Sequence, residues 1–294
     1  MSSLRCNGLD IEYESLGDPG APAILLIMGL GMQLVAWPEA FCRHLVERGF
    51  RVIRFDNRDV GLSGRVTGGK RPNLVWAMLA ARLRLPLRPP YTLNDMAADA
   101  IGLIDGLGIA QVHVVGASMG GMIAQVLAAR FPQRVLSLTS IMSSSGNLRL
   151  SRPKADALRA LLSRPGDPRN PEIVIEHLVR VFGVIGSPGF PADPAELRER
   201  VSRSVRRGYY PDGVARQLLA VIAAGDRRKL LRTIVAPTLV IHGAADPLVR
   251  LDAGQDTARN IPGSRLMVVD GMGHDLPPAL YERLAEAIAA HCAS

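Results

Sequence analysis

Apolar residues along the chain follow two different periods. Six short runs rich in aliphatic residues predict strands: 23–28, 51–55, 112–115, 134–142, 237–242 and 265–270. The first of these, AILLIM, is apolar throughout, as a strand buried on both faces is. The segments 4–10 and 11–16 flank Asn7-Gly8 and predict an opening hairpin.

Between these runs, apolar residues recur every three or four positions, which predicts helices. The segments with this pattern are 38–48, 92–107, 119–130 and 278–291. Thr92 is a favourable N-cap for the second of them. Its predicted apolar stripe comprises Met96, Ala100, Leu103 and Ile104. Strands that alternate with helices predict an α/β fold, with a mostly parallel sheet flanked by helices.

Two segments interrupt this alternation. Residues 147–232 have no strand pattern and read as helices joined by stretches rich in Pro and Gly. We predict that they form a helical cap inserted into one core domain, which consists of residues 1–146 and 233–294. Residues 65–90 form a second irregular segment, with a helix predicted around NLVWAMLAARLRL.

A serine lies at the junction of a predicted strand and a predicted helix. The run VHVV ends at Gly-Ala-Ser-Met-Gly-Gly, which places Ser118 at the carboxyl end of a strand, where parallel sheets bind ligands. Gly116 and Gly120 are small, as close approach of the two backbones requires. The pattern also suits an ordinary tight turn, so its chemistry depends on partners elsewhere in the chain.

A serine hydroxyl needs a general base to become a good nucleophile. His274 lies in the Gly-rich loop GMGHDLP immediately after the last predicted strand, from which it can reach Ser118. We therefore predict that His274 is the base. The remaining histidines suit positions on the surface, in the core or in the insertion: His44, His113, His177, His242 and His291.

The base in turn needs a carboxylate to orient it. Asp246 lies in a tight Ala-Asp-Pro loop after the strand predicted at 237–242. Asp270 and Asp275 are rivals because they neighbour His274, but a side chain next to the histidine along the chain meets its Nδ1 poorly. We predict Asp246, which gives the order Ser118, Asp246, His274 and matches the order of α/β-hydrolases.

With these residues in place, the chain resembles the α/β-hydrolase superfamily. The matching stretches are LLIMGLG, IRFDNRDVGLS, VVGASMGG, LVIHGAADPLV and GMGHDLP. The first two look closest to a bacterial esterase branch that includes anthracycline methylesterases of the aclacinomycin type. The resemblance implies an α/β-hydrolase fold, a serine hydrolase of small to medium, largely apolar carboxylic esters, and an oxyanion hole formed by the N–H groups of Leu30 and Met119.

The chain departs from this family at two positions. Met28 stands where many relatives have histidine, and Asp59 stands where many have glycine. Asp56 and Arg58, in the same loop as Asp59, are expected to organise that loop rather than touch substrate. We expect an apolar substrate pocket, although methionines there also suit the core; its candidate residues are Met28, Gly29, Met32, Trp37, Trp76 and Met142.

The charge distribution bears on partners. The net charge is +8, and residues 147–232 carry all of it, with 17 Lys/Arg against 9 Asp/Glu. No nucleic-acid motif accompanies these cations, so we expect a solvated arginine-rich surface and no nucleic-acid partner. If some of these cations face the site, anionic esters would be attracted.

No cluster of His, Asp and Cys has the spacing of metal ligands, so no metal is predicted. GASMGG does not match a nucleotide-binding motif, so no cofactor is expected.

Other activities remain open at this stage. Carbon–carbon bond hydrolases, lactonases and cofactor-free perhydrolases use the same three residue types. A catalytically silent ligand-binding protein and a polyanion-binding accessory protein are the non-enzymatic alternatives. Three widely spaced cysteines, no signal peptide and no membrane-spanning run favour the cytoplasm. The oligomeric state is open.

Overall fold

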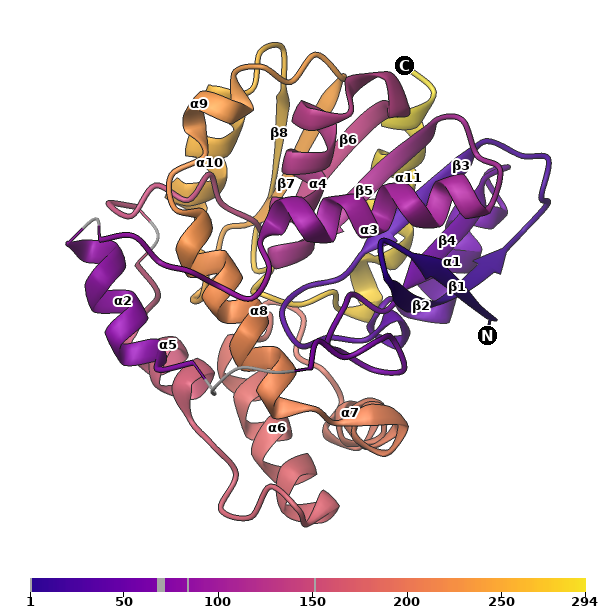
Figure 1. Ribbon diagram of the computed structural model, residues 1–294. Helices are drawn as coiled ribbons and strands as arrows, with labels where there is room; N and C mark the ends of the chain where they lie inside the picture. The colour runs from indigo at the N-terminus through magenta and orange to yellow at the C-terminus, as the bar shows by residue number, and fades with distance from the viewer. Residues whose placement is uncertain (1, 68–71, 84, 151) are drawn as a thin grey trace.

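A computed structural model describes residues 2–67, 72–83, 85–150 and 152–294. In these residues, eight strands form one sheet in the order β1-β2-β4-β3-β5-β6-β7-β8 (Figure 1). The strands are β1 (Ser2–Cys6), β2 (Leu9–Leu16), β3 (Ala23–Ile27), β4 (Arg51–Phe55), β5 (Val112–Ala117), β6 (Val135–Ile141), β7 (Thr238–Gly243) and β8 (Arg265–Val269). β2 pairs antiparallel with β1 and β4, and the other neighbours are parallel. The predicted mostly parallel sheet is therefore confirmed.

Helices cover both faces of this sheet. They are α1 (Glu39–Val46), α3 (Leu93–Gly106), α4 (Met119–Arg130), α10 (Leu251–Asn260) and α11 (Tyr281–Cys292). Thr92 caps α3 as predicted, in a reciprocal capping box with Asp95. Helix α10 was not predicted, because its buried face consists of small and polar residues such as Ala253 and Thr257 rather than an apolar stripe.

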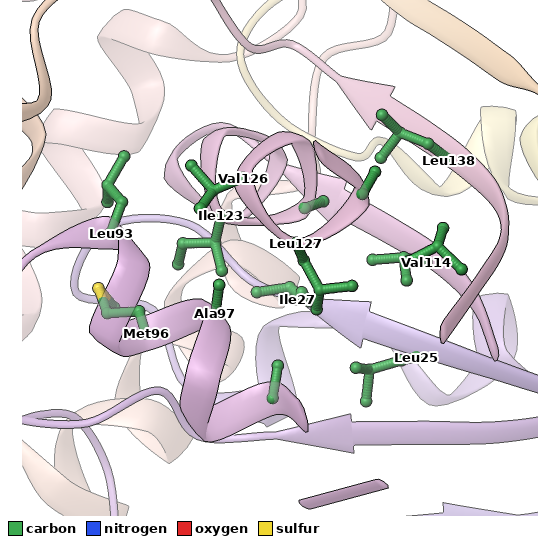
Figure 2. Packing of buried hydrophobic residues seen from close by; sticks show 14 of the residues in the cluster. Leu25, Ile27, Leu93, Met96, Ala97, Val114, Ile123, Val126, Leu127 and Leu138 are labelled. Carbon is green, nitrogen blue, oxygen red and sulfur yellow. The ribbon is translucent and has the colours of Figure 1, made fainter. Parts of the chain in front are cut away.

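The core lies in two layers, because successive side chains of a strand point to opposite faces. On β3, Leu25 and Ile27 pack with α3 and α4 (Figure 2), whereas Ile24 and Leu26 pack with α1 and α11. All four side chains are completely buried. Burying each contributes roughly 1.5–3 kcal/mol relative to an exposed side chain, so β3 is firmly fixed in the centre of the sheet.

The segment between β6 and β7 contains helices and no strand in its described residues. It comprises α5 (Ala155–Leu162), α6 (Pro171–Ile185), α7 (Pro194–Gly208), α8 (Pro211–Ala224) and α9 (Arg228–Leu231). Helices α6 and α7 share a small apolar cluster separate from the two sheet layers. Figure 1 shows α5 to α8 gathered on one side of the sheet.

Helix α2 (Leu74–Arg82) lies in the irregular segment 65–90 and packs against α8. Residues 68–71 and 84 of that segment lie outside the described residues. Within the described part of the chain, no helix has both the length and the apolar character needed to cross a bilayer.

Candidate active site

Ser118 occupies a strained turn between β5 and α4. Its φ of 55° and ψ of −118° are unfavourable for a residue with a side chain, at a typical cost of about 1–3 kcal/mol. The flanking glycines make the turn possible, because a Cβ at Gly116 would lie 2.2 Å from Gly120 O. A Cβ at Gly120 would lie 2.0 Å from Ile27 O. The Ser118 N–H donates to Ile141 O at 2.9 Å, which ties the turn to the end of β6.

The structure brings Ser118, His274 and Asp246 into one hydrogen-bonded chain. Ser118 Oγ lies 2.9 Å from His274 Nε2. On the other side of the ring, His274 Nδ1 lies 2.7 Å from Asp246 Oδ2. The three residues follow β5, β8 and β7, so parallel strands direct all of them to one edge of the sheet.

Asp246 is itself fixed by its own loop. Its Oδ1 accepts hydrogen bonds from the N–H groups of Leu248 and Val249, both at 2.8 Å. The buried His242 ring lies 3.7 Å from Asp246 Oδ2 and points its Nε2 at Val249 O, 2.7 Å away. Burial lowers the pKa of His242, which keeps this ring neutral beside the carboxylate.

The two rival carboxylates do not contact the histidine ring. Asp270 is exposed at the end of β8. Asp275 instead accepts a hydrogen bond from Ser187 Oγ, and burial raises its pKa. Of the other histidines, His113 bonds to Ser137 in the core and His291 bonds to backbone carbonyls, as structural roles require.

Two backbone N–H groups beside Ser118 are free to donate. Leu30 lies in the loop after β3, and Met119 is the first residue of α4. Within the described residues, neither N–H group has a hydrogen-bond partner. The loop approaches the serine closely, since a Cβ at Gly29 would lie 3.7 Å from Ser118 Oγ. Both N–H groups are therefore available to a further hydrogen-bond acceptor.

The loop after β4 is held by its own charged residues, as predicted. Asp56 accepts hydrogen bonds from the N–H groups of Leu34 at 2.7 Å and Leu62 at 2.9 Å. Arg58 makes a two-pronged ion pair with the buried Asp99, with both N···O distances at 2.6 Å. Neither side chain contacts Ser118 or His274 among these bonds.

Helix α8 contacts the loop that carries Leu30. The fully buried Gln217 accepts a hydrogen bond from the Gly31 N–H at 2.9 Å and donates one to Arg58 O at 2.8 Å. Val214 fills the space over Gly31, where a Cβ would lie 2.9 Å from its methyl carbon. Gly31 has a φ of 67°, so both its backbone conformation and this close contact favour glycine.

The departure from glycine at residue 59 also involves α8. Asp59 has a φ of 67°, a conformation that glycine adopts readily and other residues rarely do. Its carboxylate accepts from Arg216 Nε at 2.7 Å and from the Val66 N–H at 2.8 Å. A second buried pair joins Arg207 of α7 to Asp56 at 2.6 Å. These two insertion arginines are therefore neutralised by carboxylates.

A different part of the insertion contacts the loop of His274. The His274 N–H donates to Ile185 O at 2.8 Å, at the end of α6. Ser187 Oγ accepts from the Gly273 N–H at 2.7 Å and donates to Asp275. The backbones approach closely here, since a Cβ at Gly273 would lie 2.2 Å from Gly186 O. The insertion thus positions the histidine loop.

The predicted pocket residues lie in different environments in the structure. Gly29 lies against Ser118, Met32 is partly exposed, and Met28 and Met142 are buried at the ends of β3 and β6. The prediction for Trp37 was wrong, because its ring is fully buried and stacks on Phe41 in the core, with 5.6 Å between ring centroids.

The pocket prediction for Trp76 was also wrong. This side chain is 54% exposed on α2 and lies on the surface of the protein. The apolar character of Trp37 and Trp76 indicated burial against something, but the sequence pattern did not distinguish a pocket wall from the core or from an exposed face.

Sequence reasoning did not find Gln217, Ser187, Arg207 or Arg216. No local motif marks these residues, since each acts across more than 80 positions of the chain. A weak signal for Arg216 was the unusual Asp59, which needs a compensating partner. Within the described residues, no group of three or more potential ligands is arranged to bind a metal ion.

A model of the alpha/beta hydrolase fold family matches residues 22–277. The chain belongs to the alpha/beta hydrolase family. Among similar proteins of this family is the rhodomycin D methylesterase of Streptomyces peucetius, 29% identical over 95% of this chain and 93% of that protein. The 3-oxoadipate enol-lactonase 2 of Acinetobacter baylyi is 27% identical over 97% and 95%. This alpha/beta hydrolase therefore has relatives that open ester bonds.

Solved structures of the family have the same fold. The esterase of Exiguobacterium antarcticum superimposes with a TM-score of 0.76 at 20% identity, covering 100% of this chain and 99% of that one. The family, the methylesterase relatives and the geometry around Ser118 agree on a carboxylesterase-type hydrolase that acts on a small-molecule substrate.

Proposed function

We propose that this alpha/beta hydrolase cleaves carboxylic esters through an acyl-enzyme on Ser118. In this proposal, His274 is the general base, Asp246 orients it, and the Leu30 and Met119 N–H groups form the oxyanion hole. The observation that supports it best is the continuous hydrogen-bonded chain of 2.9 Å and 2.7 Å that joins the serine, histidine and aspartate.

Each group has a defined task in the two steps. His274 Nε2 removes the proton of Ser118 as Oγ attacks the ester carbonyl, and Asp246 stabilises the imidazolium that forms. The two N–H groups donate to the oxyanion of the tetrahedral intermediate, a contribution of about 3–4 kcal/mol for one such donor in other enzymes. The imidazolium then protonates the leaving alcohol, and a water activated by His274 releases the acid.

The test is a series of p-nitrophenyl esters of increasing acyl length, with purified wild type, Ser118→Ala and His274→Ala. We expect each substitution to lower kcat by at least about a thousandfold, because triad members act as a unit. Fluorophosphonate labelling of wild type and not of Ser118→Ala would show an activated serine. Turnover that survives Ser118→Ala would disprove the acyl-enzyme, and wild type that neither labels nor hydrolyses would indicate a silent ligand-binding protein.

The acyl and alcohol parts of the substrate are a finer proposal. We propose largely apolar esters of small to medium size, and methyl esters are the first to test because two of the relatives are methylesterases. Met32 and the buried Met28 and Met142 near the ends of β3 and β6 would supply adaptable apolar contacts.

Lactone hydrolysis is the second candidate, since the enol-lactonase relative covers nearly the whole chain. A lactone is an ester whose alcohol and acid belong to one molecule, so the same groups would open it. Comparing kcat/KM for methyl esters and for five-membered lactones separates the two. Hydrolases of carbon–carbon bonds are also among the relatives of this chain, and turnover of a vinylogous diketone would detect this activity.

The arrangement of the chain supports two further parts of the proposal. Residues 147–232 would act as the cap over a core formed by residues 1–146 and 233–294.

A reducing compartment such as the cytoplasm would suit the three free cysteines. Burial raises the pKa of Cys6, Cys42 and Cys292 to about 11, which keeps each as an unreactive thiol.

A further inference from the structure

Helix α2 presents an apolar face that no described residue covers. Val75, Trp76, Leu79 and Leu83 are 74%, 54%, 47% and 59% exposed. The opposite face, with the small residues Ala77 and Ala80, is buried where α2 packs on α8. In Figure 1, α2 lies at the outer edge of the molecule. A contiguous exposed patch of large apolar side chains usually marks an interaction site.

The charged residues of this stretch of the chain are all of one sign. Residues 60–94 contain six Lys/Arg and no Asp or Glu. Two of these cations, Arg82 at the end of α2 and Arg88 six residues further along the chain, are exposed. An apolar helix face with tryptophan and flanking cations is typical of segments that lie in the surface of an anionic bilayer.

The same observations disfavour a second copy of the chain as the occupant. Two copies would bring their arginines together, and the net charge of +8 adds to the repulsion. The face is also small, because nine helical residues are only about 14 Å long, whereas a stable protein interface buries about 800 Å² on each partner.

We propose that α2 binds the protein peripherally to anionic phospholipid surfaces. Val75, Trp76, Leu79 and Leu83 would enter the boundary between headgroups and acyl chains, and Arg82 and Arg88 would contact the headgroups. This binding does not rest on the hydrolytic proposal, and Ser118→Ala should bind lipid as well as wild type does.

The chain provides its own reporter for this contact. It has two tryptophans, Trp37 and Trp76, and Trp37 is fully buried. Vesicles of phosphatidylcholine and phosphatidylglycerol in equal parts, with brominated acyl chains, should therefore quench Trp76 emission. Pure phosphatidylcholine vesicles should quench at least tenfold less at equal lipid, and 0.5 M salt should weaken the anionic binding because it screens the arginines.

The decisive variant is Val75→Asn/Leu79→Asn/Leu83→Asn, which retains the reporter. We expect its partitioning into anionic vesicles to fall at least tenfold, with unchanged circular dichroism and unchanged hydrolysis of water-soluble p-nitrophenyl acetate. The matched control, Val235→Asn/Leu266→Asn, changes exposed apolar residues before β7 and on β8 and should bind like wild type. The proposal is wrong if anionic vesicles leave Trp76 unquenched, if the triple variant binds equally, or if light scattering shows a dimer that the triple variant abolishes.

Discussion

The candidate site has two halves that differ in what holds them. Ser118 and Asp246 are fixed by the sheet and its own turns, through the Ile141 carbonyl and the N–H groups of Leu248 and Val249. The loops of Leu30 and His274 instead depend on the helical insertion, through Gln217 and Ser187. One half is therefore held by the core, whereas the insertion adds hydrogen bonds to the loops of the other half.

This difference has a consequence for how the insertion acts. A cap that only covers substrate would change binding when perturbed. An insertion that bonds to the oxyanion loop and to the histidine loop should also change the rate of the chemical step, because small displacements of such groups are costly in the transition state. Substitutions in the two halves should therefore differ in what they affect: stability for the sheet, and kcat for the insertion.

In the sheet half, the largest effect is expected from Gly120→Ala. The added Cβ would lie 2.0 Å from Ile27 O, a backbone atom of the central strand that cannot move aside. We expect a loss of about 3 kcal/mol in the free energy of unfolding, measured by urea denaturation. Gly183→Ala on α6, where nothing lies within 4 Å, is the matched control and should be neutral or stabilising. Equal stability of the two variants would contradict the tight packing around the turn of Ser118.

In the insertion half, Gln217→Leu should lower kcat about tenfold or more with little change in KM. The change removes the hydrogen bond from the Gly31 N–H and a second bond to Arg58 O in the loop after β4, each worth about 0.5–1.5 kcal/mol. Steady-state kinetics on a p-nitrophenyl ester measures this, with the exposed Gln111→Leu as control. Melting temperatures of both variants would show whether a lower kcat reflects partial unfolding. A rise in KM at constant kcat would assign Gln217 to substrate binding instead.

Ser187→Ala should have a smaller effect, a reduction of kcat by about threefold to fivefold. It leaves the Gly273 N–H and the Asp275 carboxyl without their shared partner, although the bond from the His274 N–H to Ile185 O remains. Ser163→Ala, on a serine of the insertion away from the site, should leave kcat unchanged. If both variants match wild type, the histidine loop is held by backbone contacts alone.

The smallest effect is on the pH dependence of the free energy of unfolding, and it concerns a residue packed on the sheet. Burial lowers the pKa of His291, in the last turn of α11, from its usual 6.5. Below pH 6.5 the folded chain binds fewer protons than the unfolded chain, so stability is full above pH 6.5 and decreases as the pH falls. His291→Gln should reduce the slope of unfolding free energy against pH between 7 and 5.5, by at most about 1.4 kcal/mol per pH unit. Identical slopes would show that His291 does not contribute.

The sequence by itself determined the sheet, the order of its strands along the chain and three candidate residues at one edge. The physical reason is that buried strands are continuous apolar runs, and the turn of Ser118 needs glycines on both sides. The order Ser118, Asp246, His274 could be predicted because each residue directly follows a strand, so the direction of the parallel strands alone brings the three to the same edge.

Only the tertiary structure decided which residues support these three. Gln217 and Gly31 are 186 positions apart, and the bond between them depends on how α8 packs on the loop after β3. Helix α10 and the placement of Trp37 and Trp76 were likewise beyond the sequence pattern, since periodicity reports that a face is apolar but not what covers it. Local propensity and strand direction are properties of short segments, whereas contacts between the insertion and the sheet arise only when distant segments pack together.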